Sequence, residues 1–497
     1  MKDFQNNKEE KSAGMNRRSF MTKAAVSAAG VYIVPRHVLG GKGYIAPSDR
    51  LNIAAIGAGG KGTSDLKNAF NNGAENVVAI CDVDKNRATD SIKNFPKAKV
   101  YADFREMLSK QKDIDAVTIS TPDHTHAVAA MAAMQLGIHV YVQKPLTHNI
   151  HETRVLTEAA RKYKIVTQMG NQGASNPGQE QMIEWFNKGM IGNVHTIHCW
   201  TNRPVWPQGI PFPTEGQPLP GSMSAKDWDL FVGPAEYVDY HPLYHPFKWR
   251  GWWNFGAGAL GDMGCHIIDP PFRVLQLGYP TDVECSVGQV FIKDWDAEYI
   301  PEGCPPSSFV QIGFPANERN KSKVKLIWSD GGIRPHYPDL IPPDDFLGEP
   351  GNANGAVMIG EKGIMTCGVY GLRPQLYLNS GEKITMSENF ESKNKHLKLP
   401  EYGHQTLWVE ACKAGFNSKE HKALTSSFDY SGPLNETVLM GNLAIRSYQT
   451  ATGEDSRGRH TFDGRKKLLW DGKNMKITNY EPANAYVKRE YRSGWSL

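Results

Sequence analysis

The hydrophobic pattern of the first third of the chain predicts a parallel β-sheet. Short apolar runs at residues 51–56, 77–81, 116–120 and 139–142 are separated by segments that can carry helices. Unbroken apolar runs are typical of strands buried on both faces, and strands that alternate with helices indicate a doubly wound α/β domain. We place this Rossmann-type domain at residues 51–171.

Beyond residue 171 the pattern changes to alternating apolar and polar positions, which is typical of strands with one solvated face. We expect an α+β domain with a mostly antiparallel sheet at residues 172–460, and a tail at residues 461–497 that packs on the fold. The fold class is therefore α/β. The segments with this alternation are 194–201, 283–291, 309–314, 323–329, 356–359, 363–367 and 375–378.

The first 50 residues lie outside both patterns. Arg17 and Arg18 precede a mildly apolar stretch, and the segment resembles a twin-arginine export signal. We therefore expect residues 1–50 to be signal and linker, and the protein to be periplasmic. No run approaches the roughly 18 to 20 apolar residues of a membrane span, so we expect no membrane insertion. The seven cysteines form no CxxC pair, and we expect free, mostly buried thiols.

The export segment also accounts for the basic balance of the chain. It holds nine Lys and Arg against four Asp and Glu, so the formal net charge of +4 falls to about −1 without it. A near-neutral chain does not favour a nucleic acid as partner.

A glycine-rich loop directly follows the first apolar run. Gly57, Gly59 and Gly62 have the G-x-G-x-x-G spacing, with Gly60 between them, and Asp82 ends the second apolar run. In a Rossmann unit the first glycine allows a tight turn, the second allows the backbone to approach a pyrophosphate, and the third allows close packing of helix and strand. Asp82 would accept the hydroxyls of the adenosine ribose. The sequence thus predicts a dinucleotide site that favours NAD over NADP.

Five stretches of the chain resemble the glucose–fructose oxidoreductase, inositol dehydrogenase and rhizopine-catabolism family (Gfo/Idh/MocA). The resemblance implies an open sheet in the second domain, a carbohydrate substrate and a homo-oligomer. In one departure, the family's Glu-Lys-Pro is Gln143-Lys144-Pro145, which removes a negative charge beside the lysine. The five stretches read AAIGAGGKG, VVAICDVD, YADFREML, ISTPDHTHAVAAMAAMQLGIHVYVQKP and GALGDMGCHIID.

The resemblance also implies a catalytic set of Lys144, Asp262 and His266. An ammonium at Lys144 can stabilise the alkoxide that develops as hydride leaves carbon. His266 is suited to accept the hydroxyl proton, and Asp262, four residues earlier on the same helix face, would bind a hydroxyl or orient the imidazole. The alternative is a core histidine with an acid near the start of its helix.

Further cofactor contacts are expected where strands of the first domain end. Thr121, Gln143 and Lys144 follow two of its apolar runs, at the edge where doubly wound sheets bind ligands. His126 either shapes the nicotinamide pocket or caps the helix that follows it.

A segment rich in tryptophan and proline offers candidates for substrate binding. Trp249, Arg250 and Trp252 could form the wall of a sugar site, because carbohydrate C–H faces stack on indoles; alternatively, the tryptophans bury the loop. His241 and His245 have a spacing that metal ligands can show, but the prolines that follow them disfavour a helical pair, and we expect no metal site.

Together these patterns predict an enzyme that oxidises a secondary hydroxyl of a small-molecule sugar or glycoside. Because the periplasm holds no ready supply of NAD, we expect a tightly bound dinucleotide that is recycled in place. Two alternatives remain open. One is an NAD-dependent glycosidase that works by oxidation, elimination, hydration and reduction, similar to the family's N-acetylgalactosaminidases; the other is a non-catalytic sugar-binding protein that contains NAD.

Overall fold

The computed structural model describes residues 49–387, 389–393 and 400–497. The twin-arginine motif predicted from the sequence lies outside these residues. Residues 51–497 form one structural unit, which contains both predicted domains. Within the described part of the chain, every helix is too short or too polar to cross a membrane.

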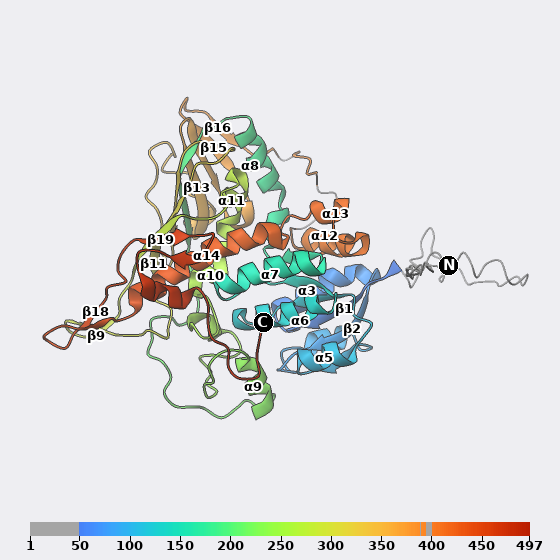
Figure 1. Ribbon diagram of the computed structural model, residues 1–497. Helices are drawn as coiled ribbons and strands as arrows, with labels where there is room; N and C mark the ends of the chain where they lie inside the picture. The colour runs from blue at the N-terminus through green and yellow to red at the C-terminus, as the bar shows by residue number, and fades with distance from the viewer. Residues whose placement is uncertain (1–48, 388, 394–399) are drawn as a thin grey trace, which may run out of the picture. The chain divides into compact units, whose positions relative to one another are not determined.

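The first domain contains a parallel sheet, as the apolar runs predicted, and four of its six strands coincide with those runs (Figure 1). Its order, β3-β2-β1-β4-β5-β6, is that of a doubly wound Rossmann fold. The strands are β1 (Asn52–Ile56), β2 (Asn76–Cys81), β3 (Lys99–Tyr101), β4 (Ala116–Ile119), β5 (His139–Val142) and β6 (Thr167–Met169).

Helices cover both faces of this sheet, and alternate side chains of each strand point to opposite faces. Ile53 and Ala55 of β1 belong to a core with α3 (Lys61–Phe70). Ala54 and Ile56 belong to the core on the other face, which is covered by α5 (Phe104–Lys110), α6 (His126–Gln135) and α7 (Ile150–Tyr163). Helix α4 (Thr89–Asn94) packs through Ile92 on the same face as α3.

One of the covering helices comes from the far end of the chain. Helix α12 (Pro400–Ala414) lies beside α3 and completes the face formed by Ile53 and Ala55 (Figure 1). Trp408 is fully buried there, with its ring centroid 5.6 Å from that of Tyr141 on β5. The first domain is therefore completed by residues outside 51–171.

The second domain is built on a ten-stranded sheet of order β16-β15-β14-β13-β7-β12-β11-β8-β19-β20. All neighbours are antiparallel except β7 and β12, which confirms the expected fold class. Because β19 pairs with β8, the predicted tail supplies one edge of this sheet. The strands are β7 (Val194–Thr201), β8 (Asp282–Val287), β11 (Ser308–Phe314), β12 (Val324–Ser329), β13 (Asn354–Gly360), β14 (Gly363–Cys367), β15 (Gln375–Leu378), β16 (Lys383–Thr385), β19 (Leu468–Asp471) and β20 (Lys476–Ile477).

Helices on one face of the large sheet join it to the first domain. The longest, α14 (Phe428–Gln449), packs on β8 and β11 and also against α7, so a single apolar core runs through both domains. The other helices of this half are α8 (Pro177–Asn187), α9 (Ala225–Val232), α10 (Gly258–Ile267), α11 (Asp269–Leu275) and α13 (Lys419–Lys422). All seven cysteines are free, and all but Cys285 are buried, as expected.

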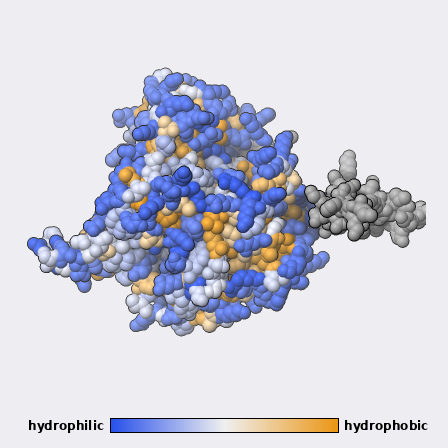
Figure 2. All heavy atoms as spheres, viewed as in Figure 1, coloured by the Kyte–Doolittle hydropathy of each residue, from blue (hydrophilic) through white to orange (hydrophobic). Residues whose placement is uncertain are grey.

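Two hairpins project together from the second domain, at the left of Figures 1 and 2. They are formed by β9 (Phe291–Lys293) with β10 (Asp296–Ala297), and by β17 (Gly453–Glu454) with β18 (His460–Thr461). Tyr299, just after the first hairpin, contacts His460. Trp295 at the tip of the first hairpin is 97% exposed.

Candidate active site

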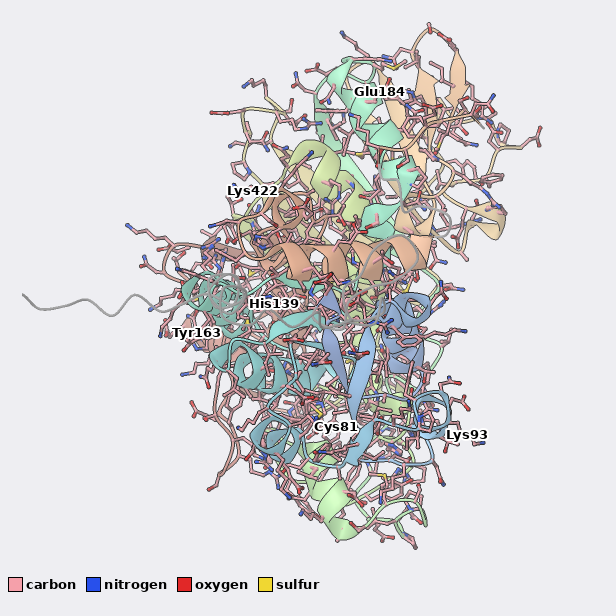
Figure 3. The ribbon with its side chains drawn as sticks, turned by 90° about the vertical axis from the view of Figure 1, so that its right-hand side faces the viewer. Cys81, Lys93, His139, Tyr163, Glu184 and Lys422 are labelled. Atoms are coloured by element: carbon pink, nitrogen blue, oxygen red, sulfur yellow. The ribbon has the colours of Figure 1, made fainter. Side chains whose placement is uncertain are left out.

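A cavity of about 580 Å³ lies at the carboxyl edge of the Rossmann sheet. In Figure 3, Cys81 marks this edge at the end of β2, and His139 marks the opposite edge at the start of β5. The ends of β1, β2, β4 and β5 form one wall, and residues of the second domain form the other. The volume is within the range of cofactor and small-molecule sites.

The glycine loop forms the floor of this cavity, directly before α3. Gly57 has φ +78°, and a Cβ there would lie 2.7 Å from the carbonyl carbon of Ser120. A Cβ at Gly62 would lie 2.0 Å from the Gly57 oxygen, so the close contact of helix and strand requires glycine. At Gly59, a Cβ would lie 2.7 Å from the backbone oxygen of Arg87. The space for a side chain at this glycine is therefore already limited by the protein's own backbone.

Asp82 lines the cavity and supports the glycine loop. Its Oδ2 accepts hydrogen bonds from the backbone N–H of Ala58 (2.8 Å) and Gly59 (3.1 Å), and its Oδ1 accepts one from Asp84 (2.9 Å). Burial raises the pKa of Asp82, and these three hydrogen bonds only partly oppose the shift. Arg87, to which the sequence pattern did not point, lines the cavity next to Gly60.

Three buried polar atoms on residues that line the cavity have no hydrogen-bond partner in the described structure. They are Thr121 Oγ1, Gln172 Oε1 and His266 Nδ1. Buried polar groups are nearly always paired, so such atoms indicate the place of a ligand with donors and acceptors of its own. A dinucleotide beside the glycine loop fits this requirement, and Gly57–Gly62, Asp82 and Thr121 are the residues that would hold it.

Lys144 and Asp262 form an ion pair between the two domains. Lys144 Nζ lies 3.0 Å from Asp262 Oδ1 and donates to the Asp262 carbonyl oxygen at 2.5 Å. Arg250 Nε approaches the same carboxylate at 3.4 Å, and Arg203 Nε at 3.9 Å. Burial would raise the pKa of Asp262, but Lys144 and Arg250 outweigh it and hold the pKa at about 2. Lys144 and Arg250 line the cavity, and Asp262 lies behind them.

His266 lines the cavity from α10, the helix that also carries Asp262. Burial, together with the nearby Lys144 ammonium, lowers its pKa well below the usual value, so the imidazole is neutral. Its ring packs edge-on against Tyr370, with centroids 4.7 Å apart. The described structure has no hydrogen bond between Asp262 and His266. The Asp262 carboxylate contacts Lys144 and Arg250 instead. In this arrangement it does not orient the imidazole of His266, which was one of its two expected roles.

His126 is the first residue of α6, but it lies behind the cavity wall. Its Nδ1 is 2.8 Å from the Pro145 oxygen and its Nε2 is 2.8 Å from the Thr121 oxygen. Burial lowers its pKa to about 4, although both carbonyls favour a proton. The ring therefore braces the turns after β4 and β5, one of which carries Lys144, while His126 itself does not line the cavity.

Gln143 lines the cavity beside Lys144 and is held by a buried carboxylate. Its Nε2 donates to Asp65 Oδ2 at 2.7 Å, and Asp65 also accepts from Ser120 Oγ and Gln405 Nε2, each at 2.9 Å. Asp65 is fully buried in α3. The sequence pattern could have indicated Asp65, because it is a charged residue at a position of the amphipathic helix that is otherwise buried.

The tryptophan segment divides between the cavity and the core. Trp249 and Arg250 line the cavity, with the guanidinium 4.2 Å from the indole centroid. Trp252 is 2% exposed, belongs to a separate aromatic cluster and donates its Nε1 hydrogen to the Leu243 oxygen at 2.8 Å. Trp252 therefore has a packing role, and its expected place in a sugar-binding wall is not supported.

Asp123 is a further ionisable residue on the cavity wall that the motif pattern did not single out. It follows β4, and its Oδ2 accepts from the Ala257 N–H at 3.1 Å. Burial raises its pKa to about 7, against the lowering effect of Arg250 and Lys144. Within residues 49–387, 389–393 and 400–497, no group of three or more His, Cys, Asp or Glu side chains could hold a metal ion.

The first domain has a Rossmann-type fold with a cavity at the carboxyl edge of its sheet. Residues 51–171 match a family model described as "Oxidoreductase family, NAD-binding Rossmann fold", and residues 182–290 match its companion, "Oxidoreductase family, C-terminal alpha/beta domain". Both models describe the Gfo/Idh/MocA family, to which these two segments of the chain are similar.

Curated relatives match part of the chain. A glycosyl hydrolase family 109 protein of Shewanella pealeana is 28% identical over 206 residues, which are 36% of this chain and 44% of the relative. Inositol 2-dehydrogenase of Salmonella typhimurium is 29% identical over 152 residues, which are 30% of this chain and 45% of the relative. The chain thus spans less than half the length of these two relatives.

Solved structures resemble the chain over more of its length. An inositol dehydrogenase homologue from Azotobacter vinelandii, in complex with NADH and myo-inositol, has a TM-score of 0.52 and 15% identity, over 79% of this chain and 94% of its own. Levoglucosan dehydrogenase, in complex with NADH and levoglucosan, has a TM-score of 0.51 and 17% identity, over 81% and 98%. At such identities the likeness shows the fold alone.

Proposed function

We propose that the protein oxidises a secondary hydroxyl of a sugar or glycoside with a tightly held NAD. The observation that carries this proposal is the place of Lys144. It lines the cavity in the turn after β5, with its Nζ 3.0 Å from Asp262 Oδ1. The neutral His266, with its unpartnered Nδ1, lies on the same cavity.

When bound, NAD supplies the hydride acceptor. Lys144 would donate a hydrogen bond to the substrate oxygen as negative charge develops there, which is the kind of stabilisation that contributes most to such reactions. Asp262 stays ionised because its pKa is about 2, and its carboxylate holds Lys144 Nζ at 3.0 Å.

His266 would take the hydroxyl proton. Its imidazole is neutral, and its Nδ1 has no partner in the described structure, so a lone pair or an N–H is available to substrate. Trp249 and Arg250 also line the cavity, Arg250 beside the same Asp262 carboxylate as Lys144, and they offer an indole and a guanidinium to a polyhydroxylated ring.

Tight retention of NAD belongs to the same proposal, because we also propose export in the folded state by the twin-arginine route. Outside the cytoplasm a diffusible cofactor would be lost after one turnover. A retained cofactor must be regenerated on the protein, either by reduction of a second sugar or by reduction of the oxidised substrate itself.

The second of these routes makes glycoside cleavage the alternative function. A transient ketone would acidify the neighbouring C–H, the glycosidic group would leave by elimination, and water addition and reduction would complete the cycle. The similarity to a glycosyl hydrolase family 109 protein favours this alternative. Both routes use the same lysine and histidine.

The experiment is to purify the protein without residues 1–50, measure nucleotide released on denaturation, and then add sugars and glycosides without NAD. Reduction of bound cofactor at 340 nm supports the oxidoreductase, and sugar release from a glycoside supports the glycosidase. Lys144→Ala should lower either rate by at least about 100-fold while keeping bound NAD. Undiminished activity in Lys144→Ala would overturn the proposed role of Lys144, and sugar binding by the wild type without any turnover would leave only the non-catalytic alternative.

A further inference from the structure

The residues around Trp495 lie at one end of the cofactor cavity. The Trp495 side chain lines this cavity together with Asp82, Val83 and Phe104, which follow β2 and β3. In a Rossmann domain an acid at the end of the second strand marks the adenosine ribose. Trp495 therefore lies at the end where the adenine base would be placed.

The indole is held in position by the first domain. The Arg105 guanidinium lies 4.4 Å from the centroid of the Trp495 ring, and the Phe104 ring lies at 6.1 Å and 46°. One face of the indole is thus covered by Arg105, while the side chain still reaches the cavity. An indole held in this way is preorganised to stack on a planar base, because little side-chain entropy remains to be lost on binding.

The chain that leads to Trp495 is fastened at two further points. Arg489 Nε and the Tyr491 hydroxyl both contact the Glu152 carboxylate of α7, at 3.0 and 2.7 Å. Arg492 Nη1 lies 2.5 Å from Asp229 Oδ1.

Arg492 is also bonded to the backbone at the end of α9. It donates to the carbonyl oxygens of Asp229 at 3.0 Å and Gly233 at 3.1 Å, and its own N–H donates to the Pro234 oxygen at 3.1 Å. Leu230 and Phe231 of α9 line the cavity themselves. Residues 489–495 therefore connect α9 with α5 across the adenine end.

We propose that Trp495 is the adenine-binding side chain of the NAD site, and that residues 489–495 retain the cofactor by closing this end of the cavity. The inference rests on the NAD site of the proposed function but not on any sugar chemistry. It assigns a binding role to the tail that the sequence pattern placed only as packing on the fold.

The test compares nucleotides of different length on the full chain, stripped of bound cofactor. For Trp495→Ala we expect the Kd for NAD and for AMP to rise roughly 10-fold or more, because base–aromatic stacking contributes on this scale. The Kd for nicotinamide mononucleotide, which has no adenine, should stay unchanged. Trp495→Phe should keep most of the affinity. Trp295→Ala, which removes the exposed indole of the projecting hairpin, is the matched control and should bind like the wild type.

Retention is tested separately by the rate at which NAD leaves during dilution. Arg492→Ala should release NAD faster than the wild type, with the thermal midpoint of the cofactor-free protein within a few degrees. Equal NAD affinity in Trp495→Ala and wild type would overturn the assignment, as would an equal loss for nicotinamide mononucleotide, which would indicate a damaged cavity. If the wild type bound no NAD, this inference and the proposed function would fail together.

Discussion

The Gln143 amide donates to the buried Asp65 carboxylate at 2.7 Å, although the two residues are 78 positions apart in the sequence. The glutamine before Lys144 thus has a negative charge behind it, supplied by another element. Asp65 accepts hydrogen bonds from three side chains, those of Ser120, Gln143 and Gln405.

This relationship predicts the effect of Asp65→Asn. The new amide would direct N–H groups at the donors of Gln143, Gln405 or Ser120, leaving buried groups unpaired at a cost of about 1 to 3 kcal/mol. We expect a lower free energy of unfolding in denaturant titrations, and weaker activity because Gln143 adjoins Lys144.

A charge exchange provides the control. In Asp65→Asn combined with Gln143→Glu, the amide donates to the carboxylate in the reverse direction, so part of the lost stability should return. Gln143→Glu alone faces Asp65 with a second carboxylate and should be destabilised. If the double variant lost as much unfolding free energy as the two single variants together, the contact between residues 65 and 143 would not explain the loss of stability.

Replacing His266 by Asn tests the proton acceptor. We expect turnover to fall about 100- to 10,000-fold, while bound NAD per chain stays the same. Because the pKa of His266 lies well below its usual value, wild-type kcat/KM should show no loss from protonation of this residue when the pH is lowered from 7.5 to 6.5. A rate that falls with an ordinary histidine pKa in the wild type, and not in the variant, would contradict the neutral, buried imidazole.

The pH dependence of stability should report Asp123. Its pKa is about 7 in the folded protein and near 4 when unfolded, so the folded state binds the additional proton between these values. Stability is therefore lost as the pH rises from about 4 to about 7, on the order of a few kcal/mol in total. Asp123→Asn lacks this contribution. The thermal midpoint of the variant minus that of the wild type should therefore increase as the pH is raised from about 4 to about 7. If the difference between the two thermal midpoints stayed constant from pH 4.5 to 8.5, Asp123 would not titrate in this range.

Two neighbouring tryptophans should respond differently to the same change. Trp252→Phe loses a buried hydrogen bond and some packing, so unfolding should be easier by about 1 to 3 kcal/mol with KM unchanged. Trp249→Phe alters the cavity wall, so KM should rise with a smaller change in stability. Chemical denaturation and steady-state kinetics on both variants check this. If KM rose for Trp252→Phe and not for Trp249→Phe, then Trp252 rather than Trp249 would contact the substrate.

Local sequence pattern was sufficient for the Rossmann sheet, because four of its six strands are short apolar runs and the glycine spacing follows the first of them. The steric reasons for Gly57 and Gly59 lie in Ser120 and Arg87, outside the glycine loop. It was also sufficient to place Asp262 and His266 on one helix. What Asp262 contacts could not be predicted, since the partners Lys144 and Arg250 come from other elements that only tertiary packing brings together.

The same limit explains His126 and Trp252. Both belong to polar or aromatic clusters that suggest a site, but the structure pairs their polar atoms with backbone carbonyls and buries them. Burial of a particular residue in a long loop depends on contacts far away in the chain, and composition alone does not encode it. Export and homo-oligomer formation stay predictions.

The position of α12 on the Rossmann sheet has a consequence for biosynthesis. The face that contains Ile53 and Ala55 is covered in part by Trp408 and its neighbours, which are translated much later. At about 5 to 20 residues per second, the ribosome completes the last Rossmann strand more than ten seconds before α12. During that interval the nascent domain carries an incompletely covered apolar face, and ribosome-bound chains that end before Pro400 should be preferred clients of chaperones.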